Sequence, residues 1–200
     1  MNYGKEAYHA VRKHMRLFTG LELPAETLAN LGRLLKDLRP AAQVRWTHVE
    51  NLHVTTKFIG EWPVARLEEL KQVLAGLPPR EPIELSLRGL GYFPNPHHPR
   101  VFWVAVQAGP TLAALAHDTE QALSTLGVSL ENRPFSAHLT LARIPDRTPL
   151  LGLKQAVAGL PSVEFGSFTA DRFFLYLSER GEGGSVYSRL AEFPFRKNSA

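Results

Sequence analysis

The sequence predicts a fold that mixes helices with strands and is built from two related halves. Segments with the alternation of strands and segments with the spacing of helices follow one another along the 200 residues. The triplet His53-Val54-Thr55 returns as His138-Leu139-Thr140. In both places a strand, a helix and a second strand lead to the triplet, and its histidine lies 37 positions after Arg16 or Val101, which open the first strand. A divergent internal duplication explains this common register.

The first half begins after an extension, residues 1–14, that looks unlike the rest of the chain. We predict a strand at 15–23, a helix that starts at Pro24 and ends before Pro40, and a short extended segment at 44–47. The strand 51–60 carries the first triplet. An amphipathic helix at 64–75 and an alternating strand at 83–90 follow, and the proline-rich stretch 91–99 is typical of a loop.

The second half begins with the apolar run 101–106, which indicates a central strand. A helix is expected at 111–126, and the strand 136–143 carries the second triplet. After a short helix at 150–158, strand patterns appear at 165–170, 172–178 and 185–193. The glycine-rich segment 181–184 predicts that the last two strands form a hairpin.

Composition bounds the function without naming it. The absence of cysteine excludes disulfides, thiol nucleophiles and cysteine-ligated zinc, and agrees with a reducing cytoplasm, where we expect the protein. No apolar run approaches the length that spans a membrane, and the first residues do not resemble a secretion signal. The net charge of +4 permits a polyanionic partner but does not identify one.

Both triplets place a histidine and a hydroxyl on one face of a strand, because side chains at i and i+2 point the same way. His53 and Thr55 therefore project together, as do His138 and Thr140, while Val54, Thr56 and Phe58, and Leu139 and Leu141, turn toward a core. If the halves pack about a pseudo-twofold axis, the two histidines meet across one cleft. A neutral imidazole accepts a proton and an imidazolium donates one, so the pair supplies a base and an acid without a metal. The threonine hydroxyls donate to anionic oxygens, and a phosphate undergoing in-line displacement suits this arrangement.

The chain resembles the two-histidine phosphoesterase superfamily, whose motif is His-x-Thr-x, and specifically its RNA 2′,3′-cyclic phosphodiesterase branch, historically called 2′–5′ RNA ligase. The matching segments span most of residues 15–143; they are 16–18, 46, 50–61, 91–94, 99–103 and 134–143. The resemblance implies a bilobal α+β fold with an antiparallel sheet flanked by helices in each lobe and a V-shaped cleft between the lobes. Residues 15–200 would form this single bilobal domain, with the duplication at about 15–60 and 100–145.

The resemblance also implies an activity: metal-independent hydrolysis of a terminal RNA 2′,3′-cyclic phosphate to a 2′-phosphate, with no cofactor. By analogy, His138 is the proton acceptor that activates water, His53 is the proton donor to the departing 3′-oxygen, and the two labels could be exchanged. Thr55 and Thr140 would hold the phosphate oxygens. Arg143 matches an arginine that the family places near the phosphate, although strict alternation puts it on the face opposite His138 unless the strand ends, twists or bulges.

For several other residues a functional role competes with a plain structural one. Lys57 shares the predicted face of His53 and could contact phosphate, or could be an ordinary exposed lysine. Phe18 and Phe93 could stack on a base. Trp103 is expected in the core, and His97 and His98 lack the further ligand that a metal site needs. Three departures from the family pattern, Thr19, Gly20 and Thr56, are expected to lie away from the chemistry.

Alternatives remain open at this point. The substrate could be a small cyclic nucleotide instead of RNA, 2′–5′ ligation could be a side activity, or the chain could be a non-catalytic module that binds RNA ends. We expect RNA with a terminal cyclic phosphate, or a nucleotide, as the partner, no membrane or protein partner, and a monomer.

Overall fold

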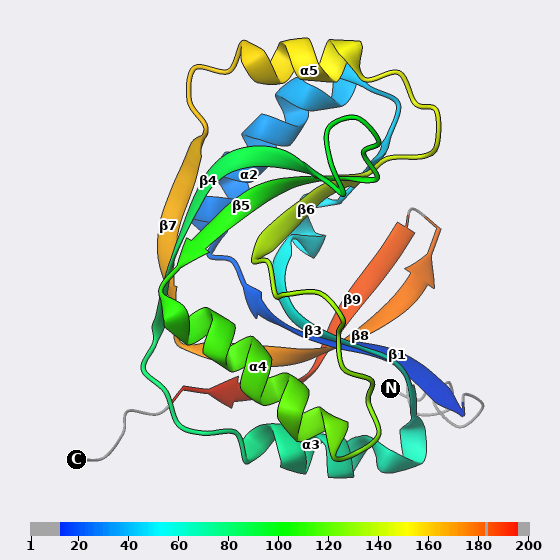
Figure 1. The fold of residues 1–200 in the computed structure, drawn as a ribbon, viewed down its shortest axis with the longest axis vertical. Coiled ribbons are helices and arrows are strands. Elements are labelled where there is room, and N and C mark those ends of the chain that lie inside the picture. Colours follow the sequence, from blue (N-terminus) through cyan, green and yellow to red (C-terminus); the bar gives the residue numbers. More distant parts are fainter. Residues whose placement is uncertain (1–12, 183, 196–200) are drawn as a thin grey trace, which may run out of the picture.

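The computed structural model describes residues 13–182 and 184–195, which form two antiparallel sheets flanked by helices (Figure 1). The first half contains β1 (His14–Glu22), α2 (Ala25–Leu38), η1 (Arg39–Ala41), β2 (Arg45–Trp46), η2 (Val49–Asn51), β3 (His53–Pro63), η3 (Val64–Arg66), α3 (Leu67–Ala75) and β4 (Ile83–Phe93). The second half contains β5 (Val101–Ala108), α4 (Pro110–Ser124), β6 (His138–Arg143), α5 (Leu151–Ala158), β7 (Glu164–Ala170), β8 (Arg172–Gly181) and β9 (Gly184–Pro194). Residues 1–12 of the predicted extension lie outside the described residues, and His14 already belongs to β1.

The predicted elements are confirmed in kind and order, with small differences at their ends. The helix expected at 64–75 begins as the 3₁₀ turn η3 and becomes α3 at Leu67. The strand expected at 83–90 continues to Phe93, so the proline-rich loop starts later than predicted. The hairpin of β8 and β9 forms as expected, with Gly181 opposite Gly184.

The strand order explains how the two halves are related. One sheet has the order β3-β1-β8-β9 and the other β2-β6-β5-β4-β7. Within them, β1 pairs with β3 and β5 pairs with β6, both antiparallel, so each predicted strand–helix–strand unit contributes two neighbouring strands. The expected bilobal α+β fold is confirmed, one lobe around each sheet.

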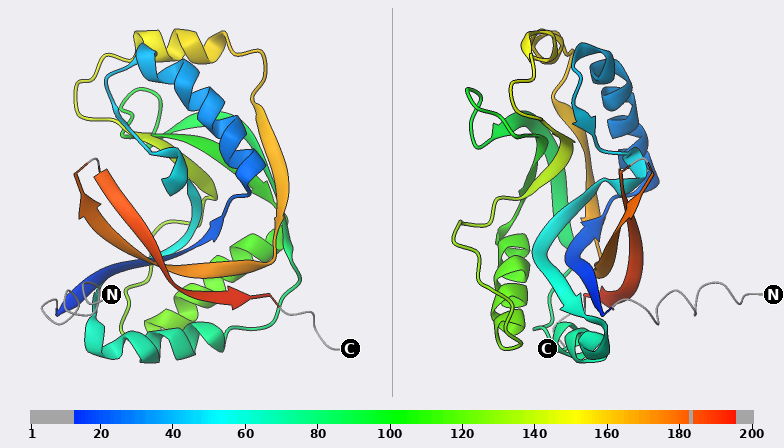
Figure 2. Two further views of the ribbon diagram at one scale, coloured as in Figure 1. Left: turned by 180° about the vertical axis from the view of Figure 1, so that it is seen from behind. Right: turned by 90° about the vertical axis from the view of Figure 1, so that its right-hand side faces the viewer.

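The helices of the two units are exchanged between the lobes. Helix α2, from the unit that holds β1 and β3, packs against β7 and α5 of the other lobe. Helix α4, which joins β5 to β6, packs against β3 and α3. Figure 2 shows α2 beside the upper sheet and α4 beside α3 below the other one. Each unit therefore completes the lobe of its partner.

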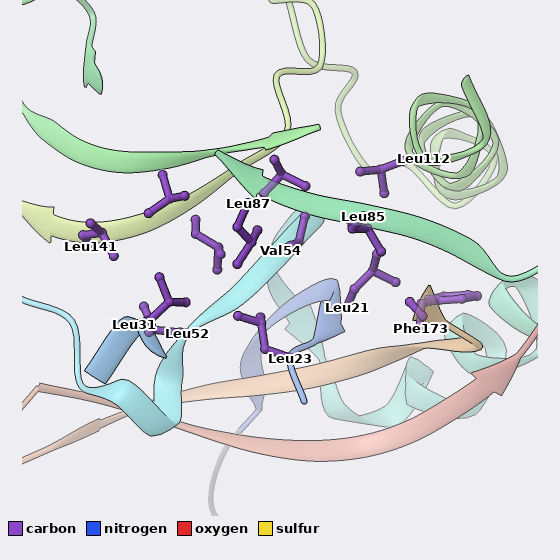
Figure 3. Close-up of a cluster of buried hydrophobic side chains, with 14 of the residues drawn as sticks. Leu21, Leu23, Leu31, Leu52, Val54, Leu85, Leu87, Leu112, Leu141 and Phe173 are labelled. Atoms are coloured by element: carbon purple, nitrogen blue, oxygen red, sulfur yellow. The ribbon is translucent and has the colours of Figure 1, made fainter. Parts of the chain in front are cut away.

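The main apolar core runs between the sheets and under the helices, and Phe18, Phe174 and Tyr176 form a second, smaller cluster. Val54 of β3 lies beside Leu87 of β4, and Leu21 of β1, Leu141 of β6 and Leu31 of α2 belong to the same buried cluster (Figure 3). Val54, Leu139 and Leu141 are fully buried, as the alternation of the two triplets predicted. Within the described residues, no helix is both long and apolar enough to cross a membrane.

Candidate active site

The two histidines stand at the first positions of β3 and β6, and these strands contact each other across the lobes. Each ring is held in the same way: Nδ1 of His53 lies 2.7 Å from the carbonyl oxygen of Asn51, and Nδ1 of His138 lies 2.7 Å from that of Ser136. Because a carbonyl oxygen only accepts, each Nδ1 carries its proton and donates it. Nε2 is then the nitrogen that can exchange a proton with a substrate.

Burial keeps both imidazoles neutral near pH 7. It lowers the pKa of His53 to about 4, against the opposing hydrogen bond to Asn51, and the charge of His138 lowers it further. Burial also lowers the pKa of His138, with a contribution from Arg143 and against the hydrogen bond to Ser136. The electrostatic coupling of the histidines follows from the contact between their two strands.

The threonines share the faces of their histidines. Gly20 lies opposite Thr55 and Glu22 opposite His53 in the β1–β3 pair, two steps apart on a regularly alternating strand. In the β5–β6 pair, Trp103 lies opposite Thr140 and Ala105 opposite His138. Each half of the site therefore presents one imidazole and one half-buried hydroxyl on a common face.

A bulge in β6 brings Arg143 to the same face. Phe102 pairs with Ala142 and Trp103 with Thr140, which leaves Leu141 as an extra residue in β6. Arg143 then pairs with Val101, and Val101 and Trp103 share one face of β5. Arg143 is thereby placed on the face of Thr140 and His138, where its charge lowers the pKa of His138. Of the three alternatives that the sequence left open, an end, a twist or a bulge of the strand, the structure shows the bulge.

The corresponding bulge in β3 has the opposite consequence for Lys57. Thr19 pairs with Lys57 and Gly20 with Thr55, so Thr56 is the extra residue. Lys57 turns away from His53, is 4% exposed, and its Nζ lies 2.7 Å from Glu120 Oε1 and 2.9 Å from the carbonyl oxygen of Ser129. The prediction that Lys57 shares the face of His53 is wrong. Its ammonium group instead ties β3 to α4 and to the loop that leads to β6.

Phe58 takes the place on this face that Lys57 was expected to have. Phe58 pairs with Phe18 of the neighbouring strand β1, and the two ring centroids are 6.0 Å apart. Phe58 is 50% exposed, so the expectation that it covers the core is also wrong. Phe58 and Arg143 each stand five positions after their histidine, a correspondence in the duplication that could have revealed Phe58 from the sequence.

The two aromatic residues predicted to stack on a base differ in their surroundings. Phe18 is 2% exposed and lies between His53, at 4.6 Å between ring centroids, and Tyr176, at 5.0 Å. Both of its faces are occupied, so Phe18 supports the His53 ring and does not offer a platform for a base. Phe93 is half-buried and meets His138 edge to face at 4.9 Å. Trp103, expected in the core, is half-buried beside Phe93 on the face of Thr140.

Metal ligands do not gather in the described part of the chain: no group of three or more His, Cys, Asp or Glu side chains could hold an ion there. His97 and His98 are exposed in the loop between β4 and β5, where their backbone N–H groups both donate to Asn95 Oδ1. The two histidines are therefore adjacent because they form part of a turn in this loop.

Comparison with known proteins agrees with this geometry. Residues 21–103 and 104–187 each match the family described as LigT-like phosphoesterase. An RNA 2′,3′-cyclic phosphodiesterase of Methanothermobacter thermautotrophicus is 31% identical over 181 residues, covering 90% of this chain and 98% of the relative. One of Archaeoglobus fulgidus is 31% identical over 179 residues, covering 90% of this chain and 99% of the relative.

Solved structures show the same fold. A protein of Thermus thermophilus is 30% identical with a TM-score of 0.74, covering 91% of this chain and 98% of that one. E. coli LigT complexed with 3′-AMP is 26% identical with a TM-score of 0.75, covering 92% of this chain and 99% of that one. By sequence and by fold, the chain belongs to the LigT-like phosphoesterase family.

Proposed function

We propose that this protein hydrolyses the terminal 2′,3′-cyclic phosphate of RNA to a 2′-phosphate without a metal ion, with His53 and His138 as acid and base. The observation that carries the proposal is the matched pair of imidazoles. Each is fixed through Nδ1 by the carbonyl two residues earlier, and each has a threonine on its own face. The relatives named RNA 2′,3′-cyclic phosphodiesterases support the reaction class.

The reaction follows from the two Nε2 atoms. Nε2 of His138 takes a proton from water, and the resulting hydroxide attacks phosphorus in line with the 3′-oxygen. The bond between phosphorus and the 3′-oxygen breaks, and Nε2–H of His53 gives its proton to that oxygen. The products are a 3′-hydroxyl and a 2′-phosphate. Thr55, Thr140 and Arg143 donate hydrogen bonds to the remaining phosphate oxygens.

The acid role of His53 requires the charge of the substrate. In the free protein the pKa of His53 is about 4, so its ring is neutral at pH 7. A bound phosphodiester carries a negative charge, and an opposite charge within a few ångströms favours the protonated imidazole. The proposed labels therefore describe the substrate complex, and exchanging them gives the same products.

The direct test is a short RNA with a 2′,3′-cyclic phosphate incubated with EDTA-treated protein. We expect a 2′-phosphate product, and each of His53→Ala and His138→Ala should lower kcat by roughly 10²–10⁴-fold, the range for a positioned acid or base. Circular dichroism checks that the variants remain folded. Full activity in either variant, or turnover only after a metal is restored, would overturn the proposal.

A sulfur leaving group separates the acid from the base. A cyclic substrate with sulfur in place of the 3′-oxygen expels a thiolate, which needs little protonation. We expect this substrate to restore turnover to His53→Ala and not to His138→Ala. The reverse pattern would exchange the two labels and leave the overall reaction intact.

A further inference from the structure

A hollow of about 440 Å³ lies at the carboxyl end of β6, beyond the catalytic face. Its walls come from the loop between β4 and β5, the segment between β6 and α5, and the start of α5. Figure 1 shows these two connections beside α5 at the upper edge of the molecule. None of the histidine, threonine or arginine residues of the proposed mechanism lines the hollow.

The lining is strongly cationic. Its ionisable residues are Arg100, Arg147, Lys154, His97, His98 and a single acid, Asp146. Asp146 already pairs with Arg100, with 3.1 Å between Oδ1 and the guanidinium nitrogen. The side chain of Arg147 has no ion pair among the described residues, and Lys154 donates only to the carbonyl oxygen of Pro96, at 3.2 Å. Two cations without an acidic partner therefore face one concavity, which favours an anion.

Arg147 is held in a conformation that arginine seldom adopts. Its φ is 57°, and it is the one non-glycine residue with positive φ in the described part of the chain. Its backbone N–H donates to Asp146 Oδ1 at 3.1 Å, which keeps the turn in place. Backbone strain of this kind concentrates at sites that bind or react. The strained turn places Arg147 in the wall of the hollow.

The hollow is joined to the catalytic face through β6. Ile144 N–H donates to the carbonyl oxygen of Arg100, and Arg100 N–H donates to that of Phe93, the residue that packs against His138. Arg143 ends the strand between the two sites.

Arg45 adds a further positive charge beside Arg143. Arg45 of β2 lies directly opposite Arg143, and neither guanidinium has a hydrogen-bond or ion-pair partner in the described part of the chain. Like charges opposite each other destabilise a sheet unless an anion lies between them. These two arginines therefore stand at the end of β6, next to Ile144, which lines the hollow.

We propose that the hollow binds a backbone phosphate of the RNA, upstream of the nucleotide that carries the cyclic phosphate. This inference rests on the proposed function. The hollow begins at Ile144, six positions beyond His138, which at about 3.3 Å per strand residue is roughly 20 Å, more than one nucleotide spans. The hollow thus receives a phosphate that only an oligonucleotide possesses, and the protein prefers RNA ends to mononucleotides.

Substrate length tests the proposal. We would measure kcat/KM for a nucleoside 2′,3′-cyclic phosphate and for a tetranucleotide with the same terminal group, using Arg147→Gly and Lys154→Gln. Glycine accepts the positive φ, and glutamine keeps a donor for Pro96. Wild-type kcat/KM should rise with length. Each variant should lose about tenfold on the tetranucleotide, as for a hydrogen bond to a charged group, and nothing on the mononucleotide.

Salt dependence provides a second readout. Each lost phosphate contact should reduce the slope of log(kcat/KM) against log[salt] by about 0.7 for a single strand. Lys36→Gln removes an equivalent exposed charge from α2 and should change neither the slope nor the length dependence.

The outcomes separate the two proposals. Equal kcat/KM for both substrates in the wild type, or equal losses of kcat/KM on both substrates in the variants, would contradict phosphate binding in the hollow. Neither result would contradict the proposed function. Variants that alter only inhibition by inorganic phosphate would contradict the binding of an RNA phosphate too, because the hollow would then serve a free anion. If neither substrate is turned over, the proposed function fails. Binding of a fluorescent tetranucleotide ending in a 2′-phosphate would then test the hollow, and variants that bind it as tightly as wild type would contradict the proposal.

Discussion

At the scale of single residues, His53 and His138 each donate from Nδ1 to the carbonyl oxygen two residues earlier, but they are buried to different degrees. His53 lies against Phe18, whose other face is covered by Tyr176, and this aromatic stack shields its ring from water. Loss of hydration disfavours the charged imidazole, which is why the pKa of His53 falls to about 4. A buried histidine with a strongly lowered pKa makes the folded state sensitive to pH.

This shift predicts the direction of acid destabilisation. Between pH 6.5 and 4 the unfolded chain binds a proton at His53 that the folded chain does not, so stability falls as the pH drops through this range. We expect His53→Gln, which cannot titrate, to lose less stability than wild type between pH 7 and pH 4.5, measured by urea unfolding. His97→Gln, at an exposed histidine, should behave as wild type. Equal losses in His53→Gln and wild type would contradict the shift.

Phe58 presents an exposed aromatic ring on the face of His53, and we expect it to contact a base. Half of its surface is exposed, and an aromatic ring that stacks on a base contributes about 1–3 kcal/mol. Phe58→Ala should therefore raise KM by about 5–150-fold with little change in the unfolding midpoint. Phe58→Tyr retains a ring and should keep KM near the wild-type value. An unchanged KM in Phe58→Ala would exclude the contact.

At the scale of elements, one extra residue in each histidine-bearing strand decides which side chains share the face of the histidine. The extra residues, Thr56 and Leu141, both follow the threonine of a triplet. Because a shift of one residue reverses the faces of a strand, Phe58 and Arg143 join the histidines while Lys57 is buried. Strict alternation could not foresee this, since the bulge arises from pairing with β1 and β5.

The departures from the family pattern also meet within one element pair. Thr19 of β1 and Thr56 of β3 are buried and hydrogen-bonded to each other, with 2.7 Å between the hydroxyl oxygens. Gly20 lies close to His53. A Cβ added at Gly20 would be 2.7 Å from the carbonyl oxygen of Val54 and 3.5 Å from the His53 ring. The expectation that Thr19, Gly20 and Thr56 lie away from the chemistry stays a prediction.

The threonine pair should behave as a unit. Thr19→Val or Thr56→Val alone leaves one buried hydroxyl without its partner, which costs about 1–3 kcal/mol. Replacing both threonines should cost less than the sum of the single changes, because no hydroxyl is then left unpaired. Urea unfolding of the four proteins in this cycle measures the coupling. Strict additivity would show that the hydroxyls do not depend on each other.

At the scale of the whole molecule, the exchange of α2 and α4 joins the lobes into one core. Each helix covers the sheet that the other unit provides, and the buried cluster includes residues of both sheets. Strands β8 and β9, from the end of the chain, complete the sheet that begins with β1. Neither half can bury its apolar face alone.

The exchanged helices predict a single cooperative unfolding transition. Trp62 lies in β3 of one lobe, whereas Trp46 and Trp103 lie in β2 and β5 of the other. We would measure urea unfolding of the Trp62→Phe variant and of the Trp46→Phe/Trp103→Phe variant by tryptophan fluorescence and by far-ultraviolet circular dichroism. In each variant the two probes should give the same unfolding midpoint. Separate midpoints for the two lobes would contradict a shared core.

The sequence by itself determined the order of the elements, the duplicated unit and the side chains His53, Thr55, His138 and Thr140. These rest on local spacing, because a strand puts i and i+2 on one face and a helix repeats its apolar positions every turn. Tertiary structure alone decided the burial of Lys57, the burial of Phe18 behind His53 and the hollow beside Arg143, and its bulges put Phe58 and Arg143 on the faces of the histidines. Those features depend on which strand pairs with which, and on loops that meet only after the chain has folded.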